Sequence, residues 1–224
     1  LQALSSERAS GGSAANTMIA VANKGGSAHY GCKVARDEFG DFYLNDLEAA
    51  GVESDSSNRG EGITGKCLVF ITPDADRTMN TFLGITSAFG PDQIEEEVVS
   101  QSDYLYIEGY LLSSDTGFEA ALLAQSQAHV HGTPVAITLS DPFIVSVFKE
   151  RVQTILERGV NLLFCNDLEA MAYTETSKID EACSALSRAV GFFAVTCGPK
   201  GAVIGDRDRS LEVDGFKVDA VDTN

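Results

Sequence analysis

Three short segments of the sequence combine glycine or strand-end positions with polar residues that could hold a polar ligand. The first, at residues 10–17, reads SGGSAANT and leads from a glycine turn into a helical pattern. Glycine lets backbone N–H groups approach a ligand closely, and Asn16 could point back toward it. A plain glycine turn with Ser13 as the helix N-cap explains the same residues at least as well. The segment is not a Walker P-loop, because no Gly-Lys-Ser/Thr follows it.

The second segment, Asn166-Asp167-Leu168-Glu169, lies where an apolar run ends and a helical pattern begins. Open α/β sheets bind their ligands at such strand ends. Asn166 and Glu169 would face the same side of the first helical turn, where they could orient water around Mg²⁺. A capping box between the two residues is the alternative, and it is compatible with a role toward Mg²⁺.

The third segment, residues 195–201, reads VTCGPKG and follows another apolar run. Gly198 and Gly201 suit a tight turn beside a nucleotide, and Thr196 offers a hydroxyl group. An ordinary β-turn is the alternative interpretation.

Single charged or polar residues in apolar runs are weaker candidates. Glu108 interrupts such a run and Asp141 follows one. An acid is costly to bury unless it is paired or faces a cleft, so each could contact a ligand or simply emerge at a sheet edge. Arg77 and Asn80 are expected on an exposed strand face.

The elements that must position these residues alternate between strand and helix patterns, which predicts an α/β protein whose mainly parallel sheet is covered on both faces. Two β-rich runs within residues 60–84 flank Pro73-Asp74-Ala75-Asp76 and predict an antiparallel hairpin that could act as a lid. Strands are expected at 28–35, 104–112, 134–140, 161–166, 192–198, 201–206 and 210–216, and helices at 13–24, 38–51, 115–131, 142–158 and 167–189.

Composition excludes several classes of protein. The 224 residues are 44% hydrophobic with only 5 Pro, so the chain can bury a core and is not disordered. A formal charge of -17 works against nucleic acid as a partner, since binding phosphates needs clustered Lys and Arg. No run reaches the roughly 18 apolar residues of a membrane helix, and the first residues lack a signal-peptide pattern, so we expect no membrane partner.

The cysteines and histidines indicate the compartment and the kind of metal. The 5 cysteines are odd in number and without CxxC spacing. We interpret them as reduced core thiols of a cytoplasmic protein. The 3 histidines form no HExxH pattern and no pair with cysteine, so any metal should be a hard cation held by oxygen.

Taken in order and spacing, GGSAANT, NDLE, VTCGPKG and VDAVDTN resemble the PfkB family of carbohydrate and nucleoside kinases over essentially the whole chain. Residues 64–84 are more similar to adenosine-kinase relatives than to ribokinase. The resemblance implies a ribokinase-like three-layer α/β/α sandwich with a mainly parallel sheet and a small β-rich lid. We expect one such domain over residues 1–224, incomplete at both ends, with the lid at 60–84.

The resemblance also implies roles for the acceptor and metal sites. In the family the glycine turn holds sugar hydroxyls, which corresponds to Gly11, Gly12 and Asn16, and we add Glu108 as a substrate-binding candidate. The NDLE segment implies that Asn166 serves ATP phosphates and that Glu169 serves Mg²⁺.

On the nucleotide side, the resemblance implies that Thr196, Gly198 and Gly201 lie against ATP. Residues 222–224 match the start of the family's D-T-x-G-A-G-D signature, and Asp222 falls where relatives often bind a monovalent cation such as K⁺. The family's catalytic Asp would lie beyond Asn224, so no catalytic residue is assigned and we expect this stretch alone to be inactive.

The activity that the resemblance implies is transfer of the ATP γ-phosphoryl group to a primary hydroxyl of a ribose-containing acceptor, with adenosine favoured. Phe82, Phe89 and Tyr110 could line a base pocket, although core packing explains them more simply. Two alternatives stay open: a free-sugar kinase for ribose or fructose, and an inactive nucleoside- or sugar-binding protein of the same fold. Relatives often dimerise through the lid, and residues 60–84 could do so here.

Overall fold

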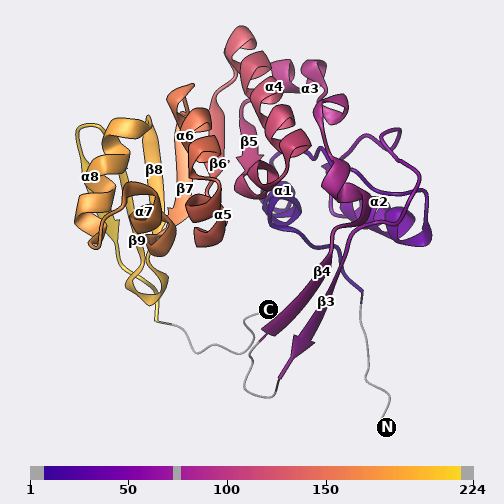
Figure 1. The fold of residues 1–224 in the computed structure, drawn as a ribbon, viewed down its shortest axis with the longest axis horizontal. Helices are drawn as coiled ribbons and strands as arrows, with labels where there is room; N and C mark the ends of the chain where they lie inside the picture. The colour runs from indigo at the N-terminus through magenta and orange to yellow at the C-terminus, as the bar shows by residue number, and fades with distance from the viewer. Residues whose placement is uncertain (1–7, 73–76, 218–224) are drawn as a thin grey trace. The chain divides into compact units, whose positions relative to one another are not determined.

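The computed structural model describes residues 8–72 and 77–217 of a chain that divides into two compact units, residues 1–89 and 90–224 (Figure 1). The single domain expected over residues 1–224 stays a prediction. The first unit contains α1 (Ser13–Asn23), β1 (Ala28–His29), α2 (Glu38–Ala49), β2 (Val52–Glu53), β3 (Lys66–Ile71), β4 (Arg77–Phe82) and the 3₁₀ turn η1 (Gly84–Ala88).

A short βαβ arrangement forms the centre of the first unit. Strands β1 and β2 pair in parallel, with α2 connecting them, and Leu47 of α2 is fully buried against Ala15 and Val52. Asp37 caps the start of α2 through its side chain, and Gly51, with a φ of 79°, follows the C-cap residue Ala50 at the end of the helix.

The antiparallel hairpin predicted within residues 60–84 is present as β3 and β4, paired from Lys66 and Phe82 at one end to Ile71 and Arg77 at the other. Every residue of both strands is exposed. The expected turn residues 73–76 lie outside the described residues, and the role of the hairpin as a lid stays a prediction.

The second unit is a sheet with the strand order β10-β9-β8-β7-β6-β5, in which β5 to β8 are parallel and β9 and β10 antiparallel. Its strands are β5 (Leu105–Glu108), β6 (Val135–Thr138), β7 (Leu162–Asn166), β8 (Phe192–Thr196), β9 (Ala202–Asp206) and β10 (Ser210–Val213). Its helices are α3 (Glu96–Gln101), α4 (Asp115–His131), α5 (Pro142–Val147), α6 (Lys149–Glu157), α7 (Asp167–Thr174) and α8 (Ile179–Ala189), with 3₁₀ turns η2 (Pro91–Gln93), η3 (Gly109–Ser113) and η4 (Gly198–Lys200).

Helices of the second unit cover one face of its sheet (Figure 1). Consecutive parallel strands are neighbours, and right-handed crossovers then place α4, α6 and α8 on the same side. The register aligns Ile107, Ile137, Leu163 and Phe193 in one row, and all four are buried in a single core cluster. This unit therefore supplies one of the helical layers expected, and the α/β class with a mainly parallel sheet and a separate small antiparallel sheet is confirmed.

Several predicted elements are shorter than their sequence patterns. The strand expected at 104–112 ends at Glu108, because Gly109 approaches the neighbouring strand and begins η3. The helix expected at 142–158 is divided at Phe148, whose φ of -112° and ψ of 31° leave the α-helical region. Of the strand expected at 28–35, only β1 and an isolated bridge from Ala35 to Gly60 form. None of the described helices combines the length and apolarity needed to span a bilayer.

Candidate active site

The carboxyl ends of the parallel strands bring most of the predicted site residues of the second unit to one edge of the sheet. Glu108 is the register partner of Thr138, and Asn166 is the register partner of Thr196. This edge is where open α/β sheets bind ligands. The sequence prediction that strand ends carry the polar residues is therefore confirmed for these positions, whereas their roles stay predictions.

Asn166 and Glu169 form a complete capping box at the start of α7. The Asn166 side-chain oxygen accepts from the Glu169 backbone N–H at 2.8 Å. Glu169 accepts in return from the Asn166 backbone N–H at 3.0 Å and from its Nδ2 at 2.8 Å. The capping-box interpretation is thus confirmed, and these bonds fix the Glu169 carboxylate at the sheet edge.

Glu169 lies in surroundings that disfavour its ionised form. Its side chain is only 5% exposed. Burial raises its pKa above the ordinary value, the charges of Asp141 and Glu108 raise it further, and the hydrogen bond from the Asn166 N–H only partly offsets them. Three carboxylates therefore share one electrostatic environment.

Glu108 lies at the end of β5 and is 8% exposed. One of its carboxylate oxygens accepts a hydrogen bond from the Ser140 hydroxyl. The next residue, Gly109, leaves no room for a side chain, since a Cβ there would lie 2.6 Å from the Thr138 carbonyl oxygen and 2.8 Å from that of Leu139. The segment that follows β6 therefore packs closely against the end of β5.

Asp141 caps helix α5. Its carboxylate accepts from the Phe143 N–H at 2.6 Å and from the Tyr110 hydroxyl at 3.3 Å. Burial, followed by the charge of Asp141, raises the pKa of Tyr110. Asp141 therefore has a structural task in addition to its position beside the other two acids.

The turn at residues 196–201 is closed by backbone hydrogen bonds. Cys197 N–H donates to the Gly201 carbonyl at 2.8 Å, and Gly201 N–H donates to the Gly198 carbonyl at 3.0 Å. Gly198 and Gly201 have φ of 55° and 96°, and a Cβ on Gly201 would lie 1.9 Å from the Val213 carbonyl oxygen. Thr196 is exposed beside this turn. The β-turn interpretation fits the geometry, and contact with a nucleotide stays a prediction.

In the first unit, the glycine turn exposes its backbone and the Asn16 side chain. Gly12, with a φ of 108°, is the N-cap of α1, so the prediction that Ser13 caps this helix is wrong. Helix α2 supports the turn: the Tyr43 hydroxyl donates to the Gly11 carbonyl at 3.0 Å. The backbone here adopts a conformation that only glycine takes without strain.

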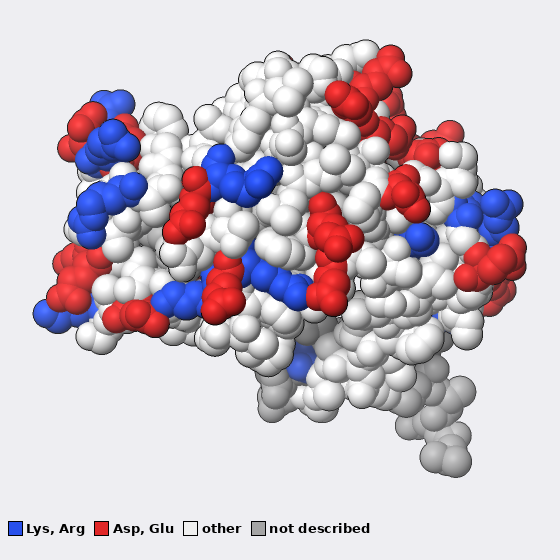
Figure 2. All heavy atoms as spheres, turned by 45° about the horizontal axis from the view of Figure 1, so that its top comes forward, with Lys and Arg blue, Asp and Glu red and all other residues white. Residues whose placement is uncertain are grey.

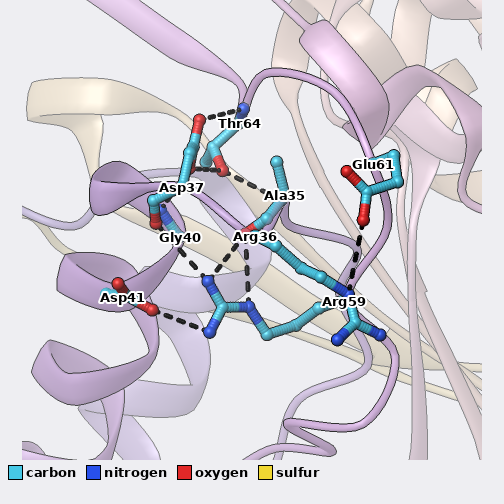
Figure 3. Close-up of polar contacts among 8 residues, drawn as sticks. All are labelled: Ala35, Arg36, Asp37, Gly40, Asp41, Arg59, Glu61 and Thr64. Carbon is cyan, nitrogen blue, oxygen red and sulfur yellow. Dashed lines mark hydrogen bonds and ion pairs between the residues drawn. The ribbon is translucent and has the colours of Figure 1, made fainter.

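A polar network that the sequence did not reveal lies between Asp37 and Thr64 (Figure 3). One Asp37 carboxylate oxygen accepts from the Gly40 N–H at 2.8 Å and from the Thr64 hydroxyl at 2.6 Å, and the other accepts from the Thr64 N–H at 2.9 Å. Thr64 is 4% exposed, and its hydroxyl accepts from the Ala35 N–H at 2.9 Å. These bonds tie the start of α2 to the segment that leads into β3.

Arg59 completes this network from the segment before β3 (Figure 3). Its guanidinium donates to the Ala35 carbonyl at 2.9 Å and pairs with Asp41 at 2.7 Å. The Asp, Gly and second Asp at the start of α2 are a visible sequence signal for a helix start, but their partners 18 or more residues away are not. We interpret the network as structural.

The remaining predicted residues lie in varied settings. Arg77 and Asn80 are on the exposed strand β4, as expected. Phe89 is buried in agreement with core packing, whereas Phe82 and Tyr110 are exposed. Asp222, the monovalent-cation candidate, lies outside the described residues. On the face seen in Figure 2, Lys and Arg are interspersed with Asp and Glu instead of forming a basic patch.

The residues present fit a magnesium ion that is bound together with substrate phosphates. Among the described residues, no three His, Cys, Asp or Glu side chains form a metal-binding group of their own. Mg²⁺ in such sites usually needs only one or two carboxylates and keeps several waters. The buried Glu169, oriented by Asn166 and raised in pKa by burial and by neighbouring acids, is a carboxylate that a divalent cation would stabilise.

Comparisons with known proteins match nearly the whole chain to one family. Residues 2–224 match the pfkB family carbohydrate kinases. The chain is 29% identical to adenosine kinase of Saccharomyces cerevisiae over 184 residues, covering 80% of this chain and 53% of that protein. It is 26% identical to the probable fructokinase-3 of Arabidopsis thaliana over 224 residues, covering 96% and 65%.

The structure of adenosine kinase from Sinorhizobium meliloti superposes with a TM-score of 0.90 at 36% identity, over 95% of this chain and 66% of that one. The expected ribokinase-like α/β fold is thereby confirmed. The chain spans 53% of the yeast relative and 66% of the S. meliloti structure.

Proposed function

The chain belongs to the pfkB family of carbohydrate kinases, and from that premise we propose that its protein transfers the γ-phosphoryl group of ATP to a primary hydroxyl of a ribose-containing acceptor, with adenosine favoured. Relatives in this family are phosphotransferases that act on sugar or nucleoside hydroxyls. The observation that carries the choice of adenosine is the likeness to the S. meliloti adenosine kinase, with 36% identity over 95% of this chain.

On the acceptor side, Gly11, Gly12 and Asn16 bind ribose hydroxyls. The exposed backbone of the turn, the φ of 108° at Gly12 and the exposed Asn16 amide support this role. Glu108 binds an acceptor hydroxyl through its carboxylate, which the Ser140 hydroxyl already orients.

On the nucleotide side, Thr196, Gly198 and Gly201 lie against ATP, and Asn166 serves its phosphates. The exposed Thr196 and the closed glycine turn after β8 support this assignment. Glu169 holds Mg²⁺, which when bound neutralises phosphate charge. Asp222 is our candidate for a monovalent cation such as K⁺.

The reaction forms a bond between the acceptor oxygen and the γ-phosphorus and breaks the bond to the ADP leaving oxygen, while a base takes the hydroxyl proton. No residue of this chain is assigned as that base. Positioning and electrostatic stabilisation supply most of the rate enhancement in such reactions. A cytoplasmic setting is also part of the proposal. Of the five thiols, Cys165 and Cys183 are buried as predicted, whereas Cys67 is exposed, so the interpretation of all five as core thiols is wrong.

A free-sugar kinase is the second candidate, and the 26% identity to a probable fructokinase over 96% of this chain favours it. A binding protein of the same fold without catalysis is the third. Dimerisation through the exposed hairpin of β3 and β4 remains part of the proposal, supported by the exposed apolar Leu68, Phe70 and Met79.

The test is a kinase assay on the protein expressed from its complete reading frame. ATP and Mg²⁺ are supplied with adenosine, inosine, ribose or fructose, and ADP release is measured. We expect the highest kcat/KM with adenosine; a preference for fructose or ribose would favour the second candidate. Acceptor binding by calorimetry without any ADP release would indicate the binding protein, and neither binding nor ADP release would refute all three.

A matched pair of glycines tests the acceptor site. Gly12 and Gly25 both have positive φ, at opposite ends of α1. Substitution by Ala strains both backbones by about 1 kcal/mol or more. We expect only Gly12→Ala to raise the KM for the acceptor, and equal acceptor kinetics in Gly12→Ala and Gly25→Ala would exclude the turn from the site.

A further inference from the structure

The backbone at Ser140 is unusual for a residue with a side chain. Ser140 has a φ of 69°, and the Asp141 N–H donates to the Leu139 carbonyl at 2.8 Å, so residues 139–141 form a γ-turn of the rare positive-φ kind. Among the described residues other than glycine, Glu175 alone shares a positive φ, and it terminates helix α7. Ser140 terminates no helix, so its strain needs another reason.

The contacts of Ser140 converge on the end of β5. Its hydroxyl donates to a Glu108 carboxylate oxygen, and its N–H donates to the Thr138 hydroxyl at 3.3 Å. The Leu139 N–H, donating to the Phe164 carbonyl at 3.0 Å, anchors the turn to β7. A Cβ on Gly109 would lie 2.8 Å from the Ser140 hydroxyl oxygen. The turn is therefore held from two strands while it presents its hydroxyl to Glu108.

We propose that Ser140 is a positioning residue that fixes the Glu108 carboxylate for the phosphoryl acceptor. The role rests on the proposed function, in which Glu108 binds an acceptor hydroxyl. Glu108 is the last residue of β5, is paired in register with Thr138 and is only 8% exposed. Because the turn that carries the Ser140 hydroxyl is anchored, this hydroxyl can hold the Glu108 side chain in one rotamer before the acceptor binds.

Substitutions at Ser140 separate the hydroxyl from the backbone. Ser140→Ala removes the hydroxyl and keeps the strained φ, whereas Ser140→Gly removes the hydroxyl and relieves the strain. Because a hydrogen bond to a charged group is lost in both, we expect both to raise the acceptor KM about 10-fold or more. The KM for ATP should stay within about 2-fold of wild type, and Ser140→Gly should melt at a higher temperature than Ser140→Ala.

Ser146→Ala is the matched control, since the Ser146 hydroxyl donates only to the Pro142 carbonyl within α5, at 2.7 Å. It should leave both KM values unchanged. In a Glu108→Ala background, which has no side-chain oxygen to accept the Ser140 hydroxyl, adding Ser140→Ala should change the acceptor KM by less than about 2-fold, because a residue that acts through Glu108 has nothing left to position.

Three results would overturn the inference while leaving the proposed function intact. They are an active wild type with an unchanged acceptor KM in Ser140→Ala, a wild-type acceptor KM in Ser140→Gly, or fully additive effects of Ser140→Ala and Glu108→Ala. A wild type that neither binds nor phosphorylates adenosine, inosine, ribose or fructose would instead refute the proposed function, and the positioning role with it. The two failures are therefore distinguishable in one set of assays.

Discussion

Replacing Asp37 by Ala should destabilise the first unit strongly, although this residue has no proposed contact with a ligand. Asp37 is the N-cap of α2, and losing such a cap costs about 1 kcal/mol. The same change leaves the N–H and hydroxyl of Thr64 without their acceptor, and Thr64 is 4% exposed. Leaving buried donors without the charged acceptor to which they were hydrogen-bonded costs about 2 kcal/mol. We therefore expect the free energy of unfolding to fall by about 3 kcal/mol in total.

The pH dependence of the stability lost in Asp37→Ala shows whether the ionised Asp37 carboxylate is its source. Burial opposes ionisation of Asp37, but hydrogen bonds from Thr64 and Gly40 outweigh it and lower the pKa of Asp37 from 3.8 to about 2. A carboxyl whose pKa is lowered by folding stabilises the fold in its ionised form. Its contribution is complete above about pH 4 and is lost as the pH falls through about 2, so the difference between wild type and Asp37→Ala should shrink over that interval.

Urea unfolding followed by circular dichroism, repeated between pH 7 and pH 2, measures this difference in the free energy of unfolding. Glu61→Ala is the matched control: Glu61 is another acid of the network region, but its side chain is 94% exposed and lies 3.9 Å from Arg36. We expect it to cost less than about 0.5 kcal/mol. An Asp37→Ala loss as small as that of Glu61→Ala, or one that does not diminish below pH 4, would refute the reasoning.

Two further substitutions separate structural from functional contributions in the second unit. Asn166→Ala should lower stability by about 1 kcal/mol through the lost helix cap and should also raise the KM for ATP. Asn161→Ala is the control: it removes the 2.8 Å hydrogen bond from the Val135 N–H at the other end of β7, and it should lower stability alone. Equal ATP kinetics in the two variants would contradict the assignment of Asn166 to ATP. Gly201→Ala should melt well below wild type, because its Cβ would lie 1.9 Å from the Val213 carbonyl oxygen, and an unchanged melting temperature would show that the turn can relax.

Local signals in the sequence were sufficient for much of the fold and for part of the site. The helix predicted at 115–131 has those bounds as α4, and Asn166 and Glu169 interact within one helical turn, so their spacing alone indicated the capping box. Strand-end positions such as Glu108 and Thr196 could also be predicted, because a parallel sheet gathers the ends of apolar runs at one edge.

Interactions between distant segments could not be predicted in this way. Thr64 lies 27 positions from Asp37, and nothing in either residue's neighbourhood indicates the other. Ser140 has the same limitation, since its positive φ follows from packing against Gly109 and β7 and not from its own preference, which disfavours it. The Ser13 prediction failed for a related reason: Gly12 adopts a φ that moves the helix start back by one residue.

Two acids at helix starts, Asp37 and Glu169, differ in the direction of their pKa shifts. Asp37 and Glu169 each accept backbone N–H bonds in the first turn of a helix, an arrangement that should favour the ionised form of both. The pKa of Asp37 is nevertheless lowered and that of Glu169 raised, because Glu169 is more deeply buried and shares its surroundings with Asp141 and Glu108. An ionised Glu169 therefore costs stability at neutral pH, and the hydrogen bond that it accepts in its capping box offsets that cost only in part. A cation bound together with a phosphorylated ligand would supply the missing counter-charge, so the raised pKa of Glu169 supports the proposal that the carboxyl edge of β5 to β7 binds phosphates.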